Sequence, residues 1–438
     1  MRKLIVPLLL ILTFLYNCGE KQAEDKLPNI ILILADDLGY GDLDCYGNTM
    51  NDTPNLDKMA SEGLVFSDFH SNCPVCSPTR AALLSGKYQQ RVGIESVVHA
   101  TKFRHTGLNP DTYTLANYTK SLGYHTGIIG KWHLGYDTAF SPTNYGFDYF
   151  RGYVSGNVDY HSHIDGAGYY DWWEQKDTLT EAGYSTDLIT KNAVNFIQNH
   201  KDEPFFLYVA HEAPHSPYQG RLDPPERTVG GKFKMQGSPE NLQATYREMI
   251  AAMDDGVGEI YKTLEQYRLF DNTIVIFLSD NGANKNGSNA LLRGYKGSLW
   301  EGGHRIPAIV VWRGRIKQGI SDELLLGMDI FPTLAALIGE KPHDEIELDG
   351  IDFSSVLLEG ETLPVRQAYW RYGGATSIRK GPWKLLHMKD STYLFNLAKD
   401  PTEQVNVINE NKTLSDSLSQ LLMDWEAEMN TYKLNTYQ

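Results

Sequence analysis

The sequence predicts an α/β fold, in which helices flank a large mixed, mostly parallel sheet. A smaller C-terminal α+β subdomain with an antiparallel sheet is expected to follow. Several short apolar runs end abruptly in polar or charged residues, as expected of strands buried on both faces. Stretches whose apolar residues have helical spacing lie between these runs, and this alternation is typical of α/β domains. From Pro364 onward the pattern changes to short strand-like segments.

Residues 1–17 are predicted to be an export signal. Two basic residues precede an apolar run over residues 4–15, which is too short to span a bilayer. The run leads into Cys18, and the sequence there is similar to the cleavage site of bacterial lipoproteins. Lipidation of Cys18 would tether the mature protein to a membrane through the polar residues 18–26. Because a tyrosine and an asparagine precede the cysteine instead of small residues, plain secretion is the alternative. In both cases we expect an exported protein, in the periplasm or on the cell surface.

Charge and length limit the possible functions. The 438 residues carry 55 acidic and 40 basic side chains, a net charge of −15, which excludes the basic footprint of a nucleic-acid-binding protein. An anionic substrate would therefore need a local cluster of cations or a metal ion. The length suits a large domain plus a small one, and we expect a catalytic domain over residues 27–360 and a C-terminal subdomain over residues 361–438.

The first strand-like run, residues 30–35, ends in Asp36 and Asp37. Two adjacent carboxylates repel each other unless a cation neutralises them, and the alternative is a polar turn or helix cap. The same arrangement recurs three times: residues 124–130 precede Lys131 and His133, residues 205–210 precede His211 and His215, and residues 273–278 precede Asp280 and Asn281. A single histidine in such a place is usually structural, but four repeats favour one site along the carboxyl edge of a sheet.

The remaining elements follow from periodicity and from residues that break it. Helices are expected over residues 54–63, 111–122, 238–267 and 329–339, and a strand over residues 306–312. Residues 348–360 are predicted to connect the two units. The subdomain is expected to contain four short antiparallel strands over residues 367–370, 376–379, 383–387 and 392–397, and a polar helix over residues 414–429.

The residues at two strand ends have the chemistry of a cation site. Asp36, Asp37, Asp280 and Asn281 all offer hard oxygen ligands, which suit Ca²⁺ or Mg²⁺ better than zinc. The long Gly- and Asn-rich loop over residues 283–305 contains Lys296, whose apolar and aromatic neighbours indicate that it packs into a pocket.

A reactive thiol is predicted at the start of a helix. Ser77 is a favourable N-cap, Pro78 suits the first helical position, and Gly86 can end the helix. Cys76 would then lie where unpaired N–H groups and the helix dipole favour an anion, and Arg80 adds a cation one turn further on.

The local pattern around Cys76 leaves two alternatives open. One is a helix start with an incidental cysteine. The other is a redox pair, because Cys73 and Cys76 have Cys-x-x-Cys spacing. No thioredoxin-like strand leads into that pair. Cys45 and Cys73 could form a disulfide in an oxidising compartment, although nothing in the sequence shows that they meet.

The pattern Cys-x-Pro-x-Arg at Cys76 resembles the modification signature of the formylglycine-dependent, arylsulfatase-like sulfatases of the alkaline phosphatase-like superfamily. The resemblance covers about residues 27–410. It includes Asp36 and Asp37, residues 130–133 (Gly-Lys-Trp-His), His215, Asp280, Asn281 and Lys296. It implies the fold described above, and Ca²⁺ (or Mg²⁺) held by Asp36, Asp37, Asp280, Asn281 and an oxygen of modified Cys76. It also implies a maturation enzyme that makes formylglycine (3-oxoalanine).

The resemblance also implies a mechanism for sulfate ester hydrolysis. The hydrated aldehyde made from Cys76 would attack sulfur, while Arg80, Lys131 and Lys296 neutralise the sulfuryl oxygens. His133 would by analogy deprotonate the second hydroxyl of the hydrate and so release sulfate. Either His215 or Lys296 would protonate the departing alcohol, and the sequence does not choose between them.

The substrate is predicted to be a sulfated carbohydrate. Residues 152–173 combine rigid aromatic rings with a few polar groups, which suits a sugar, although the same rings could simply pack under a long loop. The segment is similar to one in sulfatases that remove 4-O-sulfate from galactose-type sugars. From this we expect Asp159 and His163 to contact the sugar, within a sulfated polysaccharide.

Two further functions compete with this hypothesis. A phosphatase or phosphodiesterase of the same superfamily also pairs metal ions with strand-end carboxylates, but such enzymes typically use Ser or Thr as nucleophile and hold two metal ions. A sugar-binding lipoprotein that kept the fold is the non-enzymatic alternative. Release of sulfate would exclude this non-enzymatic alternative.

Overall fold

The structure is a computed structural model that describes residues 26–343 and 346–436. The predicted export signal and Cys18 lie outside the described residues. Within the described part, no helix has both the length and the apolar character needed to cross a bilayer.

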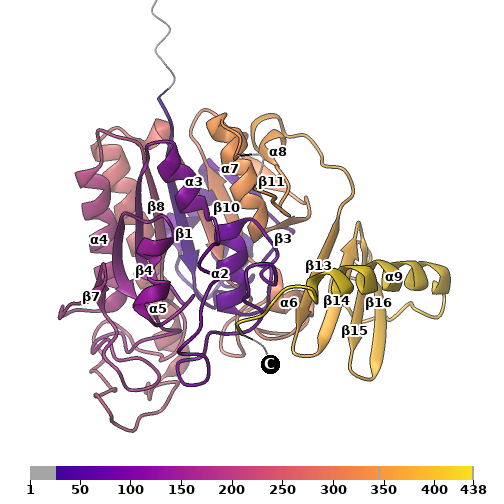
Figure 1. Cartoon of the computed structure of the whole chain (residues 1–438), viewed down its shortest axis with the longest axis horizontal. Coiled ribbons are helices and arrows are strands. Elements are labelled where there is room, and N and C mark those ends of the chain that lie inside the picture. The colour runs from indigo at the N-terminus through magenta and orange to yellow at the C-terminus, as the bar shows by residue number, and fades with distance from the viewer. Residues whose placement is uncertain (1–25, 344–345, 437–438) are drawn as a thin grey trace, which may run out of the picture.

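A large mixed sheet forms the centre of the molecule (Figure 1). Its ten strands, as found in the described residues, run in the order β11 (Gly319–Ser321), β2 (Leu64–Phe66), β10 (Ala308–Val311), β9 (Thr273–Ser279), β1 (Asn29–Ala35), β8 (Phe205–Ala210), β4 (His125–Lys131), β5 (Tyr149–Tyr153), β6 (Trp173–Glu174) and β7 (Asp177–Thr178). The five central strands from β9 to β5 are parallel, whereas β10 is antiparallel to β9 and β2, and β6 is antiparallel to β5. The predicted fold class is confirmed.

Helices cover both faces of this sheet because β1 is apolar on both faces. Leu32 and Leu34 belong to one buried cluster, and Ile31 and Ile33 belong to another. The first cluster contains side chains of α2 (Cys76–Ser85), α3 (Leu115–Ser121), α7 (Ile330–Ile338) and α8 (Ser354–Glu359). The second contains side chains of α1 (Pro54–Glu62), α4 (Ser185–Asn199) and α5 (Leu242–Gln266).

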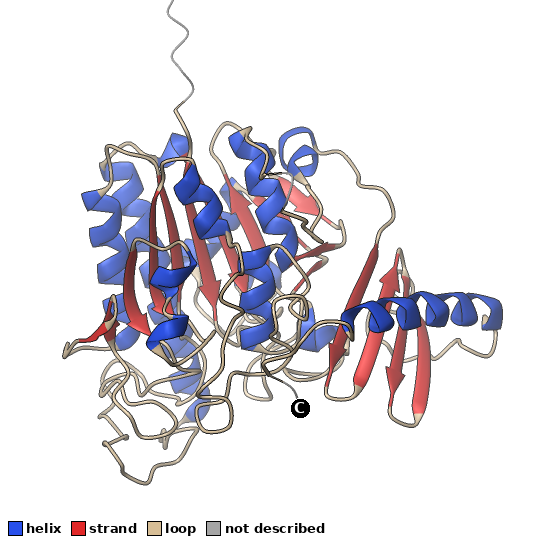
Figure 2. Ribbon diagram, in the orientation of Figure 1, coloured by secondary structure: helices blue, strands red, loops and turns tan. Residues whose placement is uncertain are grey.

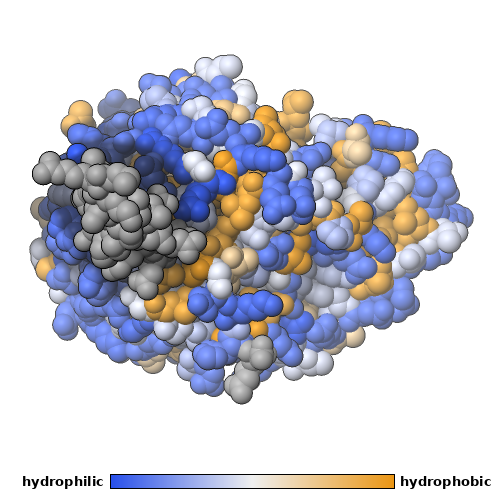
Figure 3. Space-filling view, turned by 90° about the horizontal axis from the view of Figure 1, so that it is seen from above, coloured by the Kyte–Doolittle hydropathy of each residue, from blue (hydrophilic) through white to orange (hydrophobic). Residues whose placement is uncertain are grey.

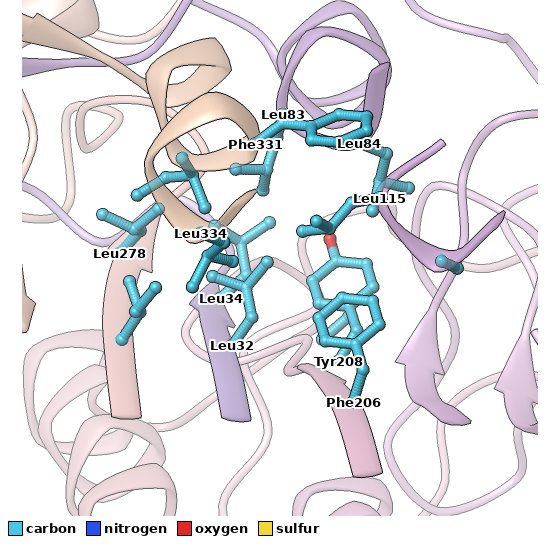
Figure 4. Packing of buried hydrophobic residues seen from close by; sticks show 14 of the residues in the cluster. Leu32, Leu34, Leu83, Leu84, Leu115, Phe206, Tyr208, Leu278, Phe331 and Leu334 are labelled. Carbon is cyan, nitrogen blue, oxygen red and sulfur yellow. The ribbon is translucent and has the colours of Figure 1, made fainter. Parts of the chain in front are cut away.

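Helix α2 is fixed by this packing. Figure 4 shows Leu83 and Leu84 of α2 close to Phe331 of α7 and above Leu34 of β1. All ten residues of α2 are buried, so the helix lies inside the protein from its first residue onward.

The strands β1, β4, β8 and β9 end at the same edge of the sheet. Figure 2 shows the longest loops gathered below that edge. The end with the amino termini of these strands is seen from above in Figure 3, where the surface is largely hydrophilic with hydrophobic residues between the polar regions. The edge predicted from the sequence to carry the site is therefore the one that the long loops cover.

The second unit is a four-stranded antiparallel sheet, as predicted. It comprises β13 (Gln367–Tyr372), β14 (Ala375–Lys380), β15 (Trp383–Met388) and β16 (Ser391–Asn396), and α9 (Lys412–Met429) lies across it in Figure 1. A buried cluster joins this sheet and α9 to Ala82 of α2 and Tyr88. After α9 the chain returns to the large unit, where Asn435 N donates to Gly93 O over 2.7 Å. The exact domain boundaries stay a prediction.

Several elements differ from the sequence-based expectation. Helix α5 begins at Leu242 and not at residue 238, because Asn241 is the N-cap and its side chain accepts a hydrogen bond from Ala244 N. Short helices lie within two segments predicted as a loop and a connection, α6 (Glu301–His304) and α8. Helix α4 was not predicted, and its buried residues pack on the sheet. A small two-stranded parallel sheet pairs β3 (Phe69–His70) with β12 (Leu325–Leu326).

Candidate active site

Cys76 is the first residue of α2, and Val75 is its N-cap. The prediction of Ser77 as the N-cap is wrong, because Ser77 is the second residue of the helix. Its hydroxyl accepts a hydrogen bond from Val98 N over 3.1 Å, which ties α2 to the segment that contains Val98. Gly86 ends the helix in the left-handed conformation, with φ 66°, as predicted. Burial raises the pKa of the Cys76 thiol, and the positive charge of Lys131 partly offsets this effect.

Arg80 lies one turn into α2, and its guanidinium holds the carboxylate of Asp280. Its Nε and Nη2 donate to Asp280 Oδ2 over 3.1 and 2.8 Å, and Nη1 donates to Lys131 O over 3.2 Å. Both side chains of this pair are fully buried. Burial disfavours the charge on Asp280, but the positive charges of Arg80 and Lys131 together outweigh it and lower the pKa of that carboxyl.

The two adjacent carboxylates at the end of β1 each have a lysine partner. Lys131 Nζ is 2.6 Å from Asp36 Oδ2, and Lys296 Nζ is 2.5 Å from Asp37 Oδ1. Burial and the nearby Asp280 raise the pKa of Asp36 to about 8. Burial acts in the same direction on Asp37, but Lys296 and His215 outweigh it and hold the pKa of Asp37 below its usual range. The two neighbours therefore have very different electrostatic environments.

The backbone at the ends of β1 and β4 has the conformations needed to bring these groups together. Asp37 and His133 have φ angles of 64° and 59°, in the left-handed region that side chains other than glycine rarely adopt. Gly130 has φ 107°, and a Cβ built there would lie 1.9 Å from Ala210 O. Only glycine allows β4 to pass this close to β8 just before Lys131.

The oxygen atoms of this cluster fit a divalent cation. Asp36 Oδ1 and Asn281 Oδ1 are buried and lack a hydrogen-bond partner within the described chain. Asn281 Nδ2 donates to Asp37 Oδ1 over 2.8 Å, which turns the amide oxygen away from that carboxylate. Buried oxygens without a donor are costly unless a cation binds them, and three carboxylates with one amide oxygen form the donor set that Ca²⁺ and Mg²⁺ prefer.

Two histidines, His133 and His215, belong to the same group of candidate site residues. His215 Nε2 is 3.7 Å from Asp37 Oδ2, and its Nδ1 is 2.6 Å from Ser216 O. His133 Nε2 is 3.2 Å from Val98 O, and its Nδ1 has no hydrogen-bond partner in the described chain. Burial lowers the pKa of His215 to about 3 and holds that of His133 well below its usual range. Burial therefore disfavours the imidazolium form of both rings while no ligand is bound.

A cleft of about 190 Å³ opens onto these groups. Cys76, His133, His215 and Lys296 line it together, so four predicted residues from distant segments share one surface. The other predicted residues, Arg80, Lys131, Asp36, Asp37, Asp280 and Asn281, are buried and connected to this surface through the contacts above. The rest of the lining is formed by Val97, Val98, His99, Ala100, Thr101, Tyr136, Ser155, Gly156, Asn157, Gly166 and Met235.

The two predicted sugar contacts are not at this cleft. Asp159 is fully buried and accepts hydrogen bonds from five donors, among them Ser162 N over 2.8 Å and Glu226 N over 2.8 Å. His163 is also fully buried and stacks on Trp172 with a centroid distance of 4.5 Å. Both residues organise the loop. The structure matches the alternative, in which the aromatic rings of residues 152–173 pack under a long loop. The prediction that Asp159 and His163 contact a sugar directly is wrong for this structure.

Sequence reasoning missed several neighbours of the site. Tyr208 lies within β8 and receives a hydrogen bond from Arg80 Nη1 over 3.4 Å; its place in an apolar run gave no signal. Asn284 Nδ2 lies 3.5 Å from Asp37 Oδ2, and its position just after Asn281 could have indicated it. Cys45, Cys73 and Cys76 are free thiols in the described chain, so the disulfide between Cys45 and Cys73 that the sequence left open is not formed.

Comparison with known proteins decides the family. The model of the family described as Sulfatase matches residues 28–340, well over half of the chain. The chain belongs to the sulfatase family. As a sulfatase it is a sulfuric ester hydrolase, and the predicted phosphatase alternative is not favoured.

Individual relatives agree with this assignment. The chain is 35% identical over 383 residues to the N-acetylgalactosamine-6-sulfatase of Mus musculus, which covers 82% of this sulfatase and 71% of the relative. It is 33% identical over 402 residues to an arylsulfatase of Hemicentrotus pulcherrimus, covering 85% and 70%. Among solved structures, Ps i-CgsB in complex with k-i-k-neocarrahexaose superposes with a TM-score of 0.83 at 30% identity, covering 91% of this chain and 93% of that one.

Proposed function

We propose that this sulfatase hydrolyses O-sulfate esters on sugars of a sulfated polysaccharide, with a formylglycine made from Cys76 by a maturation enzyme. The observation that carries the proposal is the position of Cys76. It lines the cleft together with His133, His215 and Lys296, above a buried cluster of three carboxylates and the cations Arg80 and Lys131. When present, formylglycine supplies the oxygen nucleophile, and Ca²⁺ or Mg²⁺ stabilises the charge that develops on the sulfuryl oxygens.

The chain's own residues then have distinct tasks. Arg80 holds Asp280, and Lys131 holds Asp36, so both carboxylates are fixed in orientation before any ligand binds. Lys296 extends to the cleft surface, where its ammonium can bind a sulfuryl oxygen. His133 lines the cleft beside Val98, and its Nδ1, which has no hydrogen-bond partner in the described chain, can accept a proton.

His215 and Lys296 are the two candidates for protonating the leaving alcohol. Replacing His215 by alanine is expected to lower sulfate release from a sugar sulfate about a hundredfold, while an aryl sulfate with an acidic phenol loses much less. A good leaving group departs without a proton, so only the sugar ester depends on the acid. The measurement is kcat/KM on both substrates. Equal losses of kcat/KM on both substrates would mean that another group protonates the leaving alcohol. The variant Lys296→Ala, assayed in parallel, tests whether that group is Lys296.

The position of the sulfate ester is the finer part of the proposal. The sequence favoured 4-O-sulfated galactose or N-acetylgalactosamine, but the two residues behind that preference lie away from the cleft. One relative is named as an N-acetylgalactosamine-6-sulfatase, and a structural neighbour is described with a neocarrahexaose. The first name supports a galactose-type sugar with the sulfate at position 6, whereas the second names an oligosaccharide ligand and no sulfate position.

A panel of substrates tests this proposal. It contains galactose and N-acetylgalactosamine sulfated at O-4 or at O-6, sulfated galactans, and the matching phosphate esters. We expect sulfate release from a galactose-type sugar sulfate and none of comparable rate from the phosphates. Turnover confined to phosphates would contradict the proposal. Turnover of other sugar sulfates alone would contradict the galactose-type preference and leave the sulfatase chemistry in place.

Export is also part of the proposal. We propose that the mature protein acts in the periplasm or on the cell surface, with Cys18 as the site of a lipid anchor. The support is the sequence pattern of residues 1–18. A membrane-tethered enzyme would meet a polymeric substrate outside the cell, which agrees with the proposed polysaccharide.

A further inference from the structure

The loop that carries Lys296 connects the cleft to a buried charge network. Lys296 N donates to Ala283 O over 2.9 Å, and Gly297 N donates to Pro74 O over 2.8 Å. These backbone bonds place Lys296 against the segment that leads into Cys76. Shortly after Gly297 the same loop enters α6, whose first residue, Glu301, is fully buried.

Glu301 is held by two residues of the C-terminal subdomain. Lys384 Nζ of β15 lies 2.9 Å from Glu301 Oε1 and 2.8 Å from an oxygen of Glu403. Glu301 N also donates to Glu403 Oε2 over 2.7 Å. All three side chains are fully buried, so water screens none of these contacts.

A second contact ties the same loop to Glu403. Arg293 Nη1 donates to Glu403 O over 2.7 Å, and its guanidinium lies 3.6 Å from the centre of the Trp300 ring. Trp300 in turn packs against Tyr393 and Phe395 of β16, with ring centroids 5.4 and 5.8 Å apart. The loop is therefore held on both sides of Lys296 by the C-terminal subdomain.

The C-terminal sheet also supports the segment before Cys76. Trp370 Nε1 of β13 donates to Ser71 O over 2.9 Å, and Ser71 Oγ donates to Cys73 O over 2.8 Å. Ser71 N donates to His304 O at the end of α6 over 2.7 Å. Both cleft residues, Cys76 and Lys296, thus depend on contacts from the same subdomain.

This network is a structural clamp and not a second metal site. The ring nitrogens of His70 and His304 and a carboxylate oxygen of Glu301 lie close enough together to hold an ion. The ammonium of Lys384 already contacts two of these three residues, at 2.9 Å from Glu301 Oε1 and 3.3 Å from His304 Nε2. A cation would have to displace it. Arg379 adds a second positive charge 3.5 Å from Glu301 Oε2.

We infer that Lys384 and Glu403 are positioning residues for catalysis: they fix Glu301 and hold the loop of Lys296 against the Cys76 segment. The inference rests on the proposed function, because the action of Lys296 on a sulfate ester is part of that proposal. Lys384 and Glu403 do not line the cleft, so they act only through the loop. Small displacements of a group that binds the transition state cost much activity, even when the change lies far from the reacting atoms.

The test uses a variant that removes the clamp without leaving an uncompensated charge. Lys384→Met/Glu403→Gln deletes one positive and one negative charge, and Glu403→Gln alone is a milder version. We expect the double variant to fold and to lose about ten- to hundredfold in kcat on a sugar sulfate. In hydrogen exchange, the amides of Lys296 and Gly297 are expected to exchange faster than in the unaltered protein, and those of α5 are expected to stay unchanged.

A double-mutant cycle separates positioning from general stability. Lys296→Ala is made in the unaltered protein and in the double variant, and it is expected to cost about tenfold less in the double variant, because Lys296 is already misplaced there. Asp254→Asn is the matched control. Asp254 is buried and accepts from Asn55 N and Leu56 N at the start of α1, away from the cleft. This control is expected to lower the thermal midpoint, while Lys296→Ala keeps its full effect.

Each result decides one question. Full activity in the double variant, or an undiminished effect of Lys296→Ala within it, would overturn the positioning role. No effect of Lys296→Ala in the otherwise unaltered, active protein would instead contradict the role of Lys296 in the proposed function. The amide exchange at Lys296 and Gly297 reports on the clamp independently of activity.

Discussion

Replacing Cys76 by alanine is expected to lower kcat/KM for sulfate release by at least about a thousandfold. The side chain lies at the start of α2 in the cleft wall, where it is the proposed source of the nucleophile. Cys76→Ser is expected to be nearly as inactive, because a serine offers one oxygen where a hydrated aldehyde offers two. The loss is measured as released sulfate, with circular dichroism to show that the variant folds.

Cys73→Ala is the matched control for this loss. Cys73 is also buried and lies three residues earlier, but it does not line the cleft. Its thiol is expected to be dispensable, because the hydrogen bonds from Ser71 Oγ and Thr79 Oγ1 go to its backbone carbonyl. Equal inactivation by Cys73→Ala and Cys76→Ala would support the Cys-x-x-Cys redox pair and contradict a nucleophile made from Cys76 alone.

Removal of the bound cation is expected to have the second largest effect. A chelator should abolish turnover and lower the thermal midpoint, since three buried carboxylates then face one another without that charge. Restored Ca²⁺ or Mg²⁺ at a hundred times its dissociation constant should stabilise the fold by about 2.7 kcal/mol. Titration calorimetry with each ion measures the affinity and shows which ion the site prefers.

Two variants show whether the effect comes from this site. Asn281→Ala removes a buried oxygen without a donor and is expected to weaken the ion about ten- to hundredfold. Asp42→Asn is the control. It alters a buried carboxylate at the same edge whose oxygens already accept from Gly39 N, Ser288 N and Tyr246 Oη. Its ion affinity should be unchanged. Full activity after exhaustive chelation would contradict a metal-dependent mechanism.

The strand ends were the part of the site that the sequence predicted best. A strand buried on both faces must be apolar along its whole length, so the first charged residues after it, such as Asp36 and Asp280, mark its carboxyl end. Parallel neighbours then bring these ends together. The same logic could not find Tyr208, because a polar group inside an apolar run has no periodic signal.

The loops were predicted less well because their side chains can serve either the loop or a ligand. Asp159 has the polar chemistry expected of a sugar contact. However, backbone amides of its own loop and of residues 226–227 donate hydrogen bonds to its carboxylate oxygens. The prediction of Ser77 as the N-cap of α2 failed for a similar reason. Ser77 is a favourable N-cap by propensity, but its hydroxyl accepts a hydrogen bond from Val98 N in another segment. The clamp around Glu301 depends on residues about a hundred positions apart, and no local pattern reveals it.

We propose that a modified Cys76 performs sulfate ester hydrolysis in this cleft. The most direct measurement combines sulfate release from the sugar panel with the mass of the peptide containing residue 76, on samples made with and without a formylglycine-generating maturation enzyme. Turnover is expected to rise in proportion to the fraction of residue 76 that is formylglycine, and to be absent without formylglycine. Equal turnover by a sample whose Cys76 is entirely unmodified would contradict this proposal.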